Sequence, residues 1–339
     1  MPLSASQQKS RRLRMAGGLI SLGVGIGVMC LKFFAFRLTH STALLSDALE
    51  SVVNVSAASF AVWAIRAAED PPDEEHPYGH GKIEFVTAVF EGGLISFAAL
   101  LIAFESVQSL LRGAVMPNLE QGLWVVIAAG GINGLLGIVL LTIGRETNSM
   151  ALVADGKHVL SDFFTTAGIL LGLGVARWTG IAWIDPAIAL LMAGVLAYTG
   201  IPLVRTAING LIDAADPALL NKILGSLERN RDSGIIRLHH VRAMRNGRRI
   251  HVDGHIVIPE FWSIEQGHDL VEKYEKRVVG DSIPEGELEF HLDPCRRAYC
   301  PSCDLADCPI RRNPFVSRPP FTLVEIVSPL GVHERPEHS

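Results

Sequence analysis

Two segments of the chain share one pattern of polar side chains within otherwise apolar sequence. Residues 43–54 (ALLSDALESVVN) align without a gap with residues 151–162 (ALVADGKHVLSD). In each segment the polar residues fall at positions i, i+3 and i+7, which lie on one face of a helix. The matching pairs are Asp47 with Asp155, Glu50 with His158, and Asn54 with Asp162. The repeat predicts two helices that each present a polar face.

A polar face inside a membrane needs a partner, because an ionisable group at the middle of a bilayer costs at least about 2.5–3.5 kcal/mol. If the two helices pack together, four polar side chains converge: Glu50, Asn54, His158 and Asp162. Their three oxygen donors and one imidazole nitrogen suit a four-coordinate divalent metal such as zinc. Asp47 and Asp155, about one turn nearer the helix start, are predicted to line the access path or to support the ligands. The alternative is a helix pair held together by hydrogen bonds alone.

A metal at such a site competes with protons for the same atoms. Imidazole and carboxylate groups bind a metal only when they are deprotonated, so loading the metal expels protons. His158 is the best proton carrier, because an imidazole changes its charge near neutral pH, and Glu50 is the second. Asn54 can bind a metal but cannot carry a proton, because an amide does not titrate. A site exposed alternately to each side of the membrane would make a proton-coupled antiporter.

The composition indicates a membrane protein. Hydrophobic residues make up 49% of the 339 residues and charged residues 19%, against about 25% charged residues in a typical soluble protein. Apolar runs long enough to cross about 30 Å of hydrocarbon occur six times, at residues 15–36, 43–66, 84–111, 121–143, 150–176 and 182–206. We therefore predict an α-helical membrane domain of six transmembrane helices over residues 15–213.

The distribution of Lys and Arg predicts the orientation. Basic residues are concentrated in residues 1–14 and occur in the loops after the second and fourth runs, whereas the opposite loops contain only Arg37, Arg112 and Arg177. The positive-inside rule then makes both termini cytoplasmic, in a multi-pass protein of the cell (inner) membrane. The formal net charge of −5 argues against a nucleic-acid partner. No nucleophile and base pair or cofactor loop stands out in the sequence, so we do not expect an enzyme.

The sequence changes character after residue 213. Residues 214–294 are more polar and predict a helix, two strands, a helix and a strand, at 217–230, 235–244, 249–258, 263–279 and 287–292. Asn246-Gly247, between the first two strands, is typical of a hairpin turn. This order can form a three-stranded sheet with two helices on one face, which is a small α+β domain. The Pro-rich residues 309–339 show no clear period, and we predict no structure for them.

Four cysteines follow this domain, in a C-terminal extension of residues 295–339. Cys295, Cys300, Cys303 and Cys308 have the spacing C-x4-C-x2-C-x4-C. Thiolates this close together in a cytoplasmic segment, where disulfides are disfavoured, predict a structural zinc site. An iron–sulfur cluster shares the spacing of the first three, but its fourth cysteine normally lies far downstream. A third interpretation is that the thiols are free, or that they pass metal to the neighbouring histidines.

The repeat, the loop His76-Pro77-Tyr78-Gly79-His80-Gly81-Lys82 and the tail together resemble the cation diffusion facilitator family of proton-coupled divalent metal exporters. The resemblance runs from about residue 12 to residue 294. It implies a six-helix membrane bundle followed by a metallochaperone-like (ferredoxin-like) cytoplasmic domain that binds metal and dimerises. The working unit implied is a homodimer in the lipid bilayer.

The resemblance also implies a transport site, formed by Glu50, Asn54, His158 and Asp162. The second pair matches the family fully, but the family usually has Asp or His in place of Glu50 and Asp in place of Asn54. With Glu50 and Asp162 ionised, the formal charge of the four groups is −2, which balances one divalent cation. Because an amide replaces a carboxylate, iron, manganese, cobalt, nickel or cadmium stay open beside zinc.

Two further metal sites are implied by the same resemblance. Asp73, His76 and His80 coincide with a second site of the family, although a solvated acidic linker is the alternative for this loop. In the tail, the family's two-metal site falls on His240, His255, His268, His291 and Asp293. His291 and Asp293 share one face of a strand, because side chains repeat every two residues. His239 and His251 match no role.

These features predict a homodimeric antiporter that exports a divalent transition metal, zinc first, from the cytoplasm in exchange for protons. Zinc or another divalent transition metal would be both the substrate and a regulatory or structural ligand. The competing hypothesis is a membrane-anchored metal sensor or storage protein, in which the His and Cys tail acts and the helices serve as an anchor.

Overall fold

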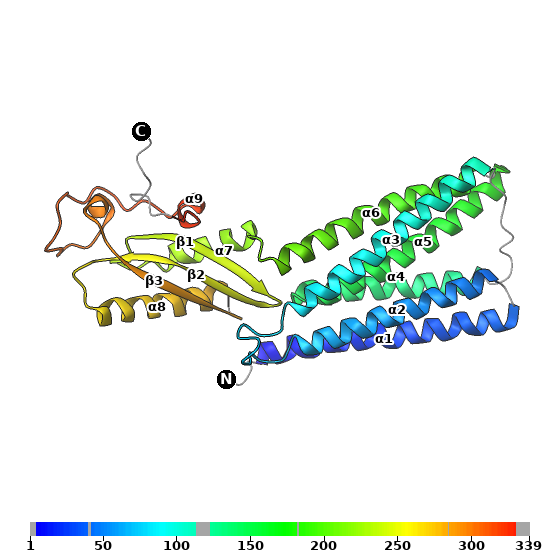
Figure 1. The fold of residues 1–339 in the computed structure, drawn as a ribbon, viewed down its shortest axis with the longest axis horizontal. Coiled ribbons are helices and arrows are strands. Elements are labelled where there is room, and N and C mark those ends of the chain that lie inside the picture. Colours follow the sequence, from blue (N-terminus) through cyan, green and yellow to red (C-terminus); the bar gives the residue numbers. More distant parts are fainter. Residues whose placement is uncertain (1–4, 40–41, 113–122, 182, 284, 330–339) are drawn as a thin grey trace. The chain divides into compact units, whose positions relative to one another are not determined.

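A computed structural model gives the fold (Figure 1). It describes residues 5–39, 42–112, 123–181, 183–283 and 285–329; in the second helix the side chains of residues 42–50 lie outside this description. The chain forms two compact units, residues 1–212 and 213–339.

The first unit consists of six long helices. They are α1 (Ala5–Thr39), α2 (Thr42–Ala67), α3 (Ile83–Arg112), α4 (Leu123–Glu146), α5 (Met150–Thr179) and α6 (Ile184–Leu211). Each helix overlaps one of the six apolar runs predicted from the sequence. Within the unit, α1 packs beside α2, α3 beside α6, and α4 beside α5 (Figure 1).

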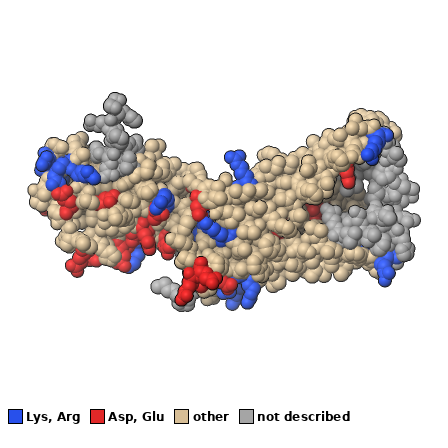
Figure 2. Space-filling view, viewed as in Figure 1, with Lys and Arg blue, Asp and Glu red and all other residues tan. Residues whose placement is uncertain are grey.

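The surface of these helices is apolar. Among the described residues, four stretches are long and apolar enough to cross a membrane: Gln8–Phe34, Ile83–Arg112, Trp124–Glu146 and Pro186–Leu211. The other two helices, α2 and α5, carry the repeated polar pattern, and the described part of α2 contains the shorter apolar stretch Ser51–Ala67. Figure 2 shows uncharged residues over the broad middle of this unit, with Lys, Arg, Asp and Glu gathered toward its ends.

Small residues let α4 and α5 approach closely. A Cβ atom added at Gly156 of α5 would lie only 2.9 Å from the backbone nitrogen of Leu141 in α4. One added at Gly137 of α4 would lie 3.0 Å from the Gly156 carbonyl oxygen. Such small-residue contacts drive helix packing in lipid, where no hydrophobic force holds helices together. They fix the helix that carries His158 and Asp162 against its neighbour.

Buried polar contacts fix the start of α5. Ser149 caps the helix by accepting from the Leu152 backbone N–H, and its hydroxyl donates to Glu84 of α3 at 2.8 Å. The Ala151 backbone N–H donates to the same carboxylate at 3.2 Å. An N-terminal carboxylate and a serine cap are both favourable at a helix start. These bonds join α3 to α5 at the end of the helix nearest the repeat.

The second unit is a three-stranded sheet with two helices. It contains α7 (Pro217–Arg229), β1 (Arg237–Asn246), β2 (Arg249–Ile258), α8 (Ile264–Ser282) and β3 (Gly286–Pro294). The strand order is β1-β2-β3, with β1 and β2 antiparallel and β2 and β3 parallel. Gly247 takes the positive φ of 61° that the predicted hairpin turn requires. The order of elements predicted from the sequence is confirmed.

The two helices cover one face of this sheet. Leu227 of α7 and Tyr274 of α8 pack with Ile256 of β2 in one fully buried core. Val257 points to the opposite face, because side chains alternate along a strand, and there it packs against Tyr299 of the extension. The sheet is therefore covered on both faces, by helices on one and by part of the extension on the other.

The prediction of no structure for residues 309–339 is wrong for the described part, which ends at residue 329. Phe321 and Ile326, in and beside the short helix α9 (Leu323–Ile326), are buried in the domain core. Arg231 reaches the Pro319 carbonyl at 2.9 Å and lies 4.0 Å above the Phe321 ring. Irregular backbone held by arginine–carbonyl bonds has no periodic sequence signal, which is why the pattern missed it.

Candidate metal centres

The polar faces of α2 and α5 meet in the structure. The Asn54 amide Nδ2 donates to Asp162 Oδ2 at 2.5 Å, and Asn54 Oδ1 lies 3.1 Å from His158 Nε2. His158 is buried, with 7% of its surface exposed. Glu50 belongs to α2, but its side chain is outside the described part of the chain, as is that of Asp47. Three of the four predicted transport ligands are therefore brought together by the described contacts.

Cavities beside these residues extend the site to other helices. One is lined by Asn54, His158 and Asp162 together with Ser21 of α1 and Asn133 of α4. A second is lined by Asn54, Asp162 and Asn133 together with Lys32 of α1. Neither Asn133 nor Lys32 belongs to the predicted set of ligands. Each is a single polar residue in an apolar run, which was the available signal.

Two further acids lie beside this site. Asp155 is 1% exposed, accepts a hydrogen bond from Ser21, and interacts electrostatically with His158 and Asp162. Glu91 of α3 is fully buried and interacts electrostatically with Asp155. Neither Glu91 carboxylate oxygen has a hydrogen-bond partner within the described residues. Asp155 therefore lies where a supporting or access-path residue was predicted.

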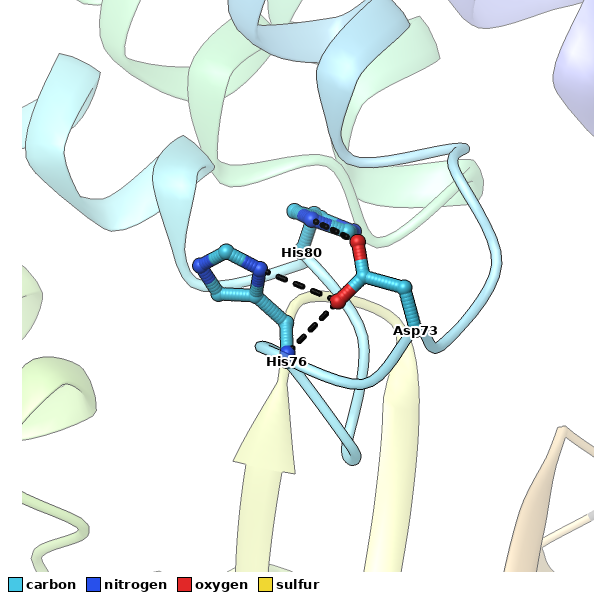
Figure 3. Close-up of side chains that lie close together, drawn as sticks. All are labelled: Asp73, His76 and His80. Atoms are coloured by element: carbon cyan, nitrogen blue, oxygen red, sulfur yellow. Dashed lines mark hydrogen bonds and ion pairs between the residues drawn. The ribbon is translucent and has the colours of Figure 1, made fainter.

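The loop group, defined as Asp73, His76 and His80, forms between α2 and α3 (Figure 3). Asp73 Oδ1 lies 3.2 Å from His76 Nδ1, and Asp73 Oδ2 lies 3.3 Å from His80 Nε2. The two imidazole rings are 4.3 Å apart. The three ligand atoms lie within 4.8 Å of one another, as donors to one metal ion must. The structure thus brings together all three residues of the predicted second site.

The backbone of this loop prepares the carboxylate of Asp73. The His76 backbone N–H donates to Asp73 Oδ1 at 2.6 Å. That bond is the main reason why the pKa of Asp73 lies below its ordinary value, and the neighbouring imidazoles of His76 and His80 lower it further. A carboxylate that stays ionised is the form that binds a cation.

The tail cluster, defined as His239, His240, His255, His291 and Asp293, lies on the sheet. His255 Nδ1 is 3.0 Å from Asp293 Oδ2, and His239 Nε2 is 3.4 Å from the same atom. The rings of His240 and His291 lie 5.3 Å and 4.9 Å from that of His255. His239, His255 and Asp293 are the three with ligand atoms within 4.8 Å of one another.

His239, which matched no role of the family, lies in this cluster. Strand alternation would send His239 and His240 to opposite faces. The register of β1 shifts between His239 and Arg242, and His240 has a φ of +54°. Such a bulge re-aims side chains, so both rings lie beside His255. The two consecutive histidines in the predicted strand were the sequence signal for this arrangement.

The remaining tail histidines stand apart from the cluster. His268, predicted as a ligand, is exposed on α8 and belongs to neither group of close ligand atoms found among the described residues. His251, which matched no family role, lies 2.6 Å from Glu287 on the neighbouring strand. The tail cluster of one chain is thus built without these two residues.

The cysteine cluster, defined as Cys295, Cys300, Cys303 and Cys308, surrounds one small cavity after β3. All four thiols are free. Burial raises the pKa of Cys295 and of Cys303. Burial acts in the same direction on Cys300, but backbone N–H bonds from Arg312 and Asn313 and nearby arginine charges outweigh it, so that its pKa lies below the ordinary value.

Comparison with known proteins identifies the two units. Residues 18–212 match the model of the cation efflux transmembrane domain, and residues 215–295 match that of the cation efflux protein cytoplasmic domain. The chain belongs to the cation diffusion facilitator family. Membership of this family supports divalent cation efflux as the activity of this integral membrane protein. The family is a class of transporters and not a class of enzymes.

Curated relatives of the facilitator match along most of its length. It is 35% identical over 284 residues to the uncharacterized transporter sll1263 of Synechocystis, covering 84% of this chain and 91% of the relative. It is 30% identical over 266 residues to the magnetosome protein MamM of Paramagnetospirillum magneticum, covering 78% and 83%. The cation-efflux pump FieF of Pectobacterium carotovorum is 27% identical over 283 residues, covering 84% and 93%.

Proposed function

We propose that this facilitator is a homodimeric antiporter that exports a divalent transition metal, zinc first, from the cytoplasm in exchange for protons. The contact of Asn54 with His158 and Asp162 supports the proposal most directly, because it joins α2 to α5 through donors that suit a divalent metal. Glu50 precedes Asn54 by four residues in α2, and we propose it as the fourth ligand on the basis of the sequence repeat. Two carboxylates and a neutral imidazole then balance one divalent cation.

Exchange with protons follows from how these donors are used. In the structure the Asn54 amide contacts both other proposed ligands. Its nitrogen donates to Asp162, and its oxygen faces His158. A metal must replace both hydrogen bonds and requires a deprotonated imidazole and carboxylate. Proton entry reverses this step and releases the metal. A site that opens alternately to each side therefore couples outward metal movement to inward proton movement.

The course of the chain supports the proposed dimer and orientation. If all six helices cross the membrane, as we propose, the two ends of the first unit lie on one side of it. The basic residues before α1 and in the loops after α2 and α4 assign this side to the cytoplasm. The match of the second unit to the family's cytoplasmic domain supports a homodimer that forms through it.

Zinc uptake into proteoliposomes, recorded together with internal pH, tests this proposal. For the wild type we expect zinc movement with proton movement in the opposite direction, and for Asp162→Ala we expect neither. Thr142→Val is the matched control, because Thr142 is exposed on α4 and donates only within its own helix, to Ile138, in the described contacts. Zinc transport by Asp162→Ala at the wild-type rate would contradict the proposed site.

The same assay separates transport from the sensor or storage hypothesis. A sensor would bind zinc through the tail cluster or the cysteine cluster, and its vesicles would show no flux in the wild type. Three groups of potential ligands outside the membrane helices support that hypothesis: the loop group, the tail cluster and the cysteine cluster. Zinc binding without any flux would favour it over the antiporter.

Ion preference tests the role of Asn54. Imidazole and carboxylate donors suit zinc, whereas the amide oxygen shifts the set toward ions that accept oxygen donors. Asn54→Asp adds a charge and removes the amide donor to Asp162, so we expect a changed order among zinc, iron, manganese, cobalt, nickel and cadmium. An unchanged order would show that Asn54 does not set selectivity.

A further inference from the structure

The cysteine cluster lies outside the matched family domains and has a built environment. Cys295 directly follows β3, Cys300 lies in a short 3-10 helix (Arg297–Ser302), Cys303 ends that helix, and Cys308 lies in the next turn. The four thiols line one cavity. Cys295 and Cys303 also pack with Tyr299 against the sheet. Four free thiols thus line one small cavity, and zinc would have to draw their sulfur atoms together, because no three of these sulfurs lie within 4.8 Å of one another.

Backbone donors point at the sulfur atoms. The Arg312 N–H donates to Cys300 Sγ at 3.5 Å, and the Asn313 N–H is a second donor to it. The Glu260 N–H donates to Cys295, and the Leu305 N–H donates to Cys303. Hydrogen bonds to the charged form favour that form. Three of the four sulfurs thus have a backbone N–H donor nearby, as sulfur ligands of a metal commonly do.

Positive charge surrounds the same cavity. Arg296, Arg297 and Arg311 line it together with the cysteines. Arg311 donates to the carbonyls of Cys300 and Cys303, both at 3.0 Å, and so ties the cysteine-bearing turn together. Four thiolates around one divalent cation leave a net charge of about −2, which Arg296 and Arg311 would offset, whereas Arg297 is paired with Glu260 at 2.6 Å.

We propose that Cys295, Cys300, Cys303 and Cys308 bind one zinc ion as a tetrathiolate site that fastens the C-terminal extension to the sheet. Four cysteines with a C-x2-C pair at the centre fit a closed, tetrahedral structural zinc site. The short distance in sequence to the fourth cysteine disfavours the iron–sulfur alternative. The site does not depend on which ion the membrane helices move.

The position of this site ties it to the tail cluster. The Cys295 N–H donates to the Ile258 carbonyl at 2.8 Å, which continues the pairing of β2 with β3 two residues beyond Asp293. The far end of the extension returns to the cluster, where the Ser328 carbonyl accepts from the His240 N–H at 2.7 Å. The extension therefore contacts the surroundings of the tail cluster at both of its described ends. Zinc in the cysteine cluster would hold this extension in place.

Thiol labelling of the full-length protein in detergent tests this proposal on the wild type. With zinc bound, we expect Cys295, Cys300, Cys303 and Cys308 to resist alkylation and to become reactive together once a strong chelator is added. Cys30, exposed on α1 and remote in sequence, is the internal reference and should react equally in both states. Equal labelling of the four with and without zinc would overturn the proposal.

Metal analysis and cobalt substitution provide the second measurement. We expect Cys300→Ser/Cys303→Ser to contain one zinc fewer per chain than the wild type, with Cys30→Ser unchanged. Cobalt should give thiolate-to-metal charge-transfer bands in the wild type and in His239→Ala/His255→Ala, but not in the double cysteine variant. Their absence from the wild type, or acid-labile sulfide in the purified protein, would overturn a zinc tetrathiolate. Zinc flux in proteoliposomes is scored separately, so failure here leaves the antiporter proposal standing.

Discussion

The proposed transport site and the tail cluster use similar donors in different surroundings. In the membrane unit, Asn54, His158 and Asp162 come from two helices, and their polar atoms already bond to one another. In the tail cluster, side chains from three strands gather around Asp293, and the His291 side chain is 70% exposed. Water can reach the outer side of the tail cluster at His291, although His239 is as buried as His158, whereas the first group lies within apolar helices.

This difference indicates what each site is suited to do. Where water is scarce, the charge of the ion must be balanced by the charges of its ligands. Without the ion, the ligands must form hydrogen bonds with one another, and this alternation favours reversible exchange. Where water is available, several imidazoles can accumulate around one carboxylate without such matching, which favours retention or sensing. We infer that the few ligands of the membrane site support movement and that the many nitrogen donors of the tail cluster support regulation.

The largest effect should separate two histidines in the tail. His239→Ala removes a side chain that lies 3.4 Å from Asp293, whereas His251→Ala removes one that pairs with Glu287 instead. We expect the first to weaken zinc binding by at least tenfold, since loss even of a supporting partner costs about 10–100-fold at metal sites. Calorimetric titration of the full chain would measure it. Equal loss in both variants would show that strand stability, not the cluster, was affected.

A second prediction concerns the positive charge of Lys32 beside the proposed transport site. Lys32 lines a cavity together with Asn54 and Asp162, and its cation opposes the charge of an incoming ion. We expect Lys32→Met to raise the apparent zinc affinity of transport by about tenfold, because charges interact strongly where water is scarce. The concentration dependence of proteoliposome uptake is the measurement. An unchanged affinity would place the lysine charge too far from the ion to matter.

A further prediction asks whether the buried acid Glu91 contributes to the proposed transport site. Both of its carboxylate oxygens lack hydrogen-bond partners within the described residues. Replacing such a group by an apolar one of similar size removes a desolvation cost of about 1–3 kcal/mol. We therefore expect Glu91→Leu to raise the thermal unfolding temperature in detergent. A stabilised variant that no longer transports would instead assign Glu91 to the proton path.

The smallest effect concerns pH at the loop group. The pKa of Asp73 lies below its ordinary 3.8, so this carboxylate keeps its charge on acidification while imidazoles protonate between about pH 5 and 8. In a variant lacking the tail cluster, Asp73→Asn should lower zinc affinity modestly throughout that range, because it removes an oxygen donor that stays charged. An affinity equal to that of the parent protein throughout the range would show that Asp73 does not bind the ion. Zinc titrations at several pH values provide the measurement.

Much of the fold follows from the sequence because its signals are periodic. The six apolar runs overlap the six helices, and Asn246-Gly247 marks the hairpin between β1 and β2. The repeat likewise predicts the contact of Asn54 with His158 and Asp162. These features depend on spacing along one element and on the pairing of two similar elements, both of which are visible in a sequence.

The missed features depend on packing between distant parts of the chain. His239 joins the tail cluster through a bulge that no alternation pattern reveals. Lys32 and Asn133 meet the transport ligands only because α1 and α4 lie against α2 and α5. The extension is held by arginine bonds to carbonyl groups, such as that of Arg231 to Pro319, which follow no period.

Zinc flux in proteoliposomes, compared between His158→Ala and His255→Ala, tests most directly whether the polar contact of α2 and α5 carries transport. Both variants remove one imidazole from a group of potential ligands, but His158 lies between membrane helices and His255 lies on the sheet. We predict that His158→Ala abolishes flux and that His255→Ala retains it, with only its regulation by zinc changed. Flux that survives in His158→Ala and disappears in His255→Ala would contradict the account.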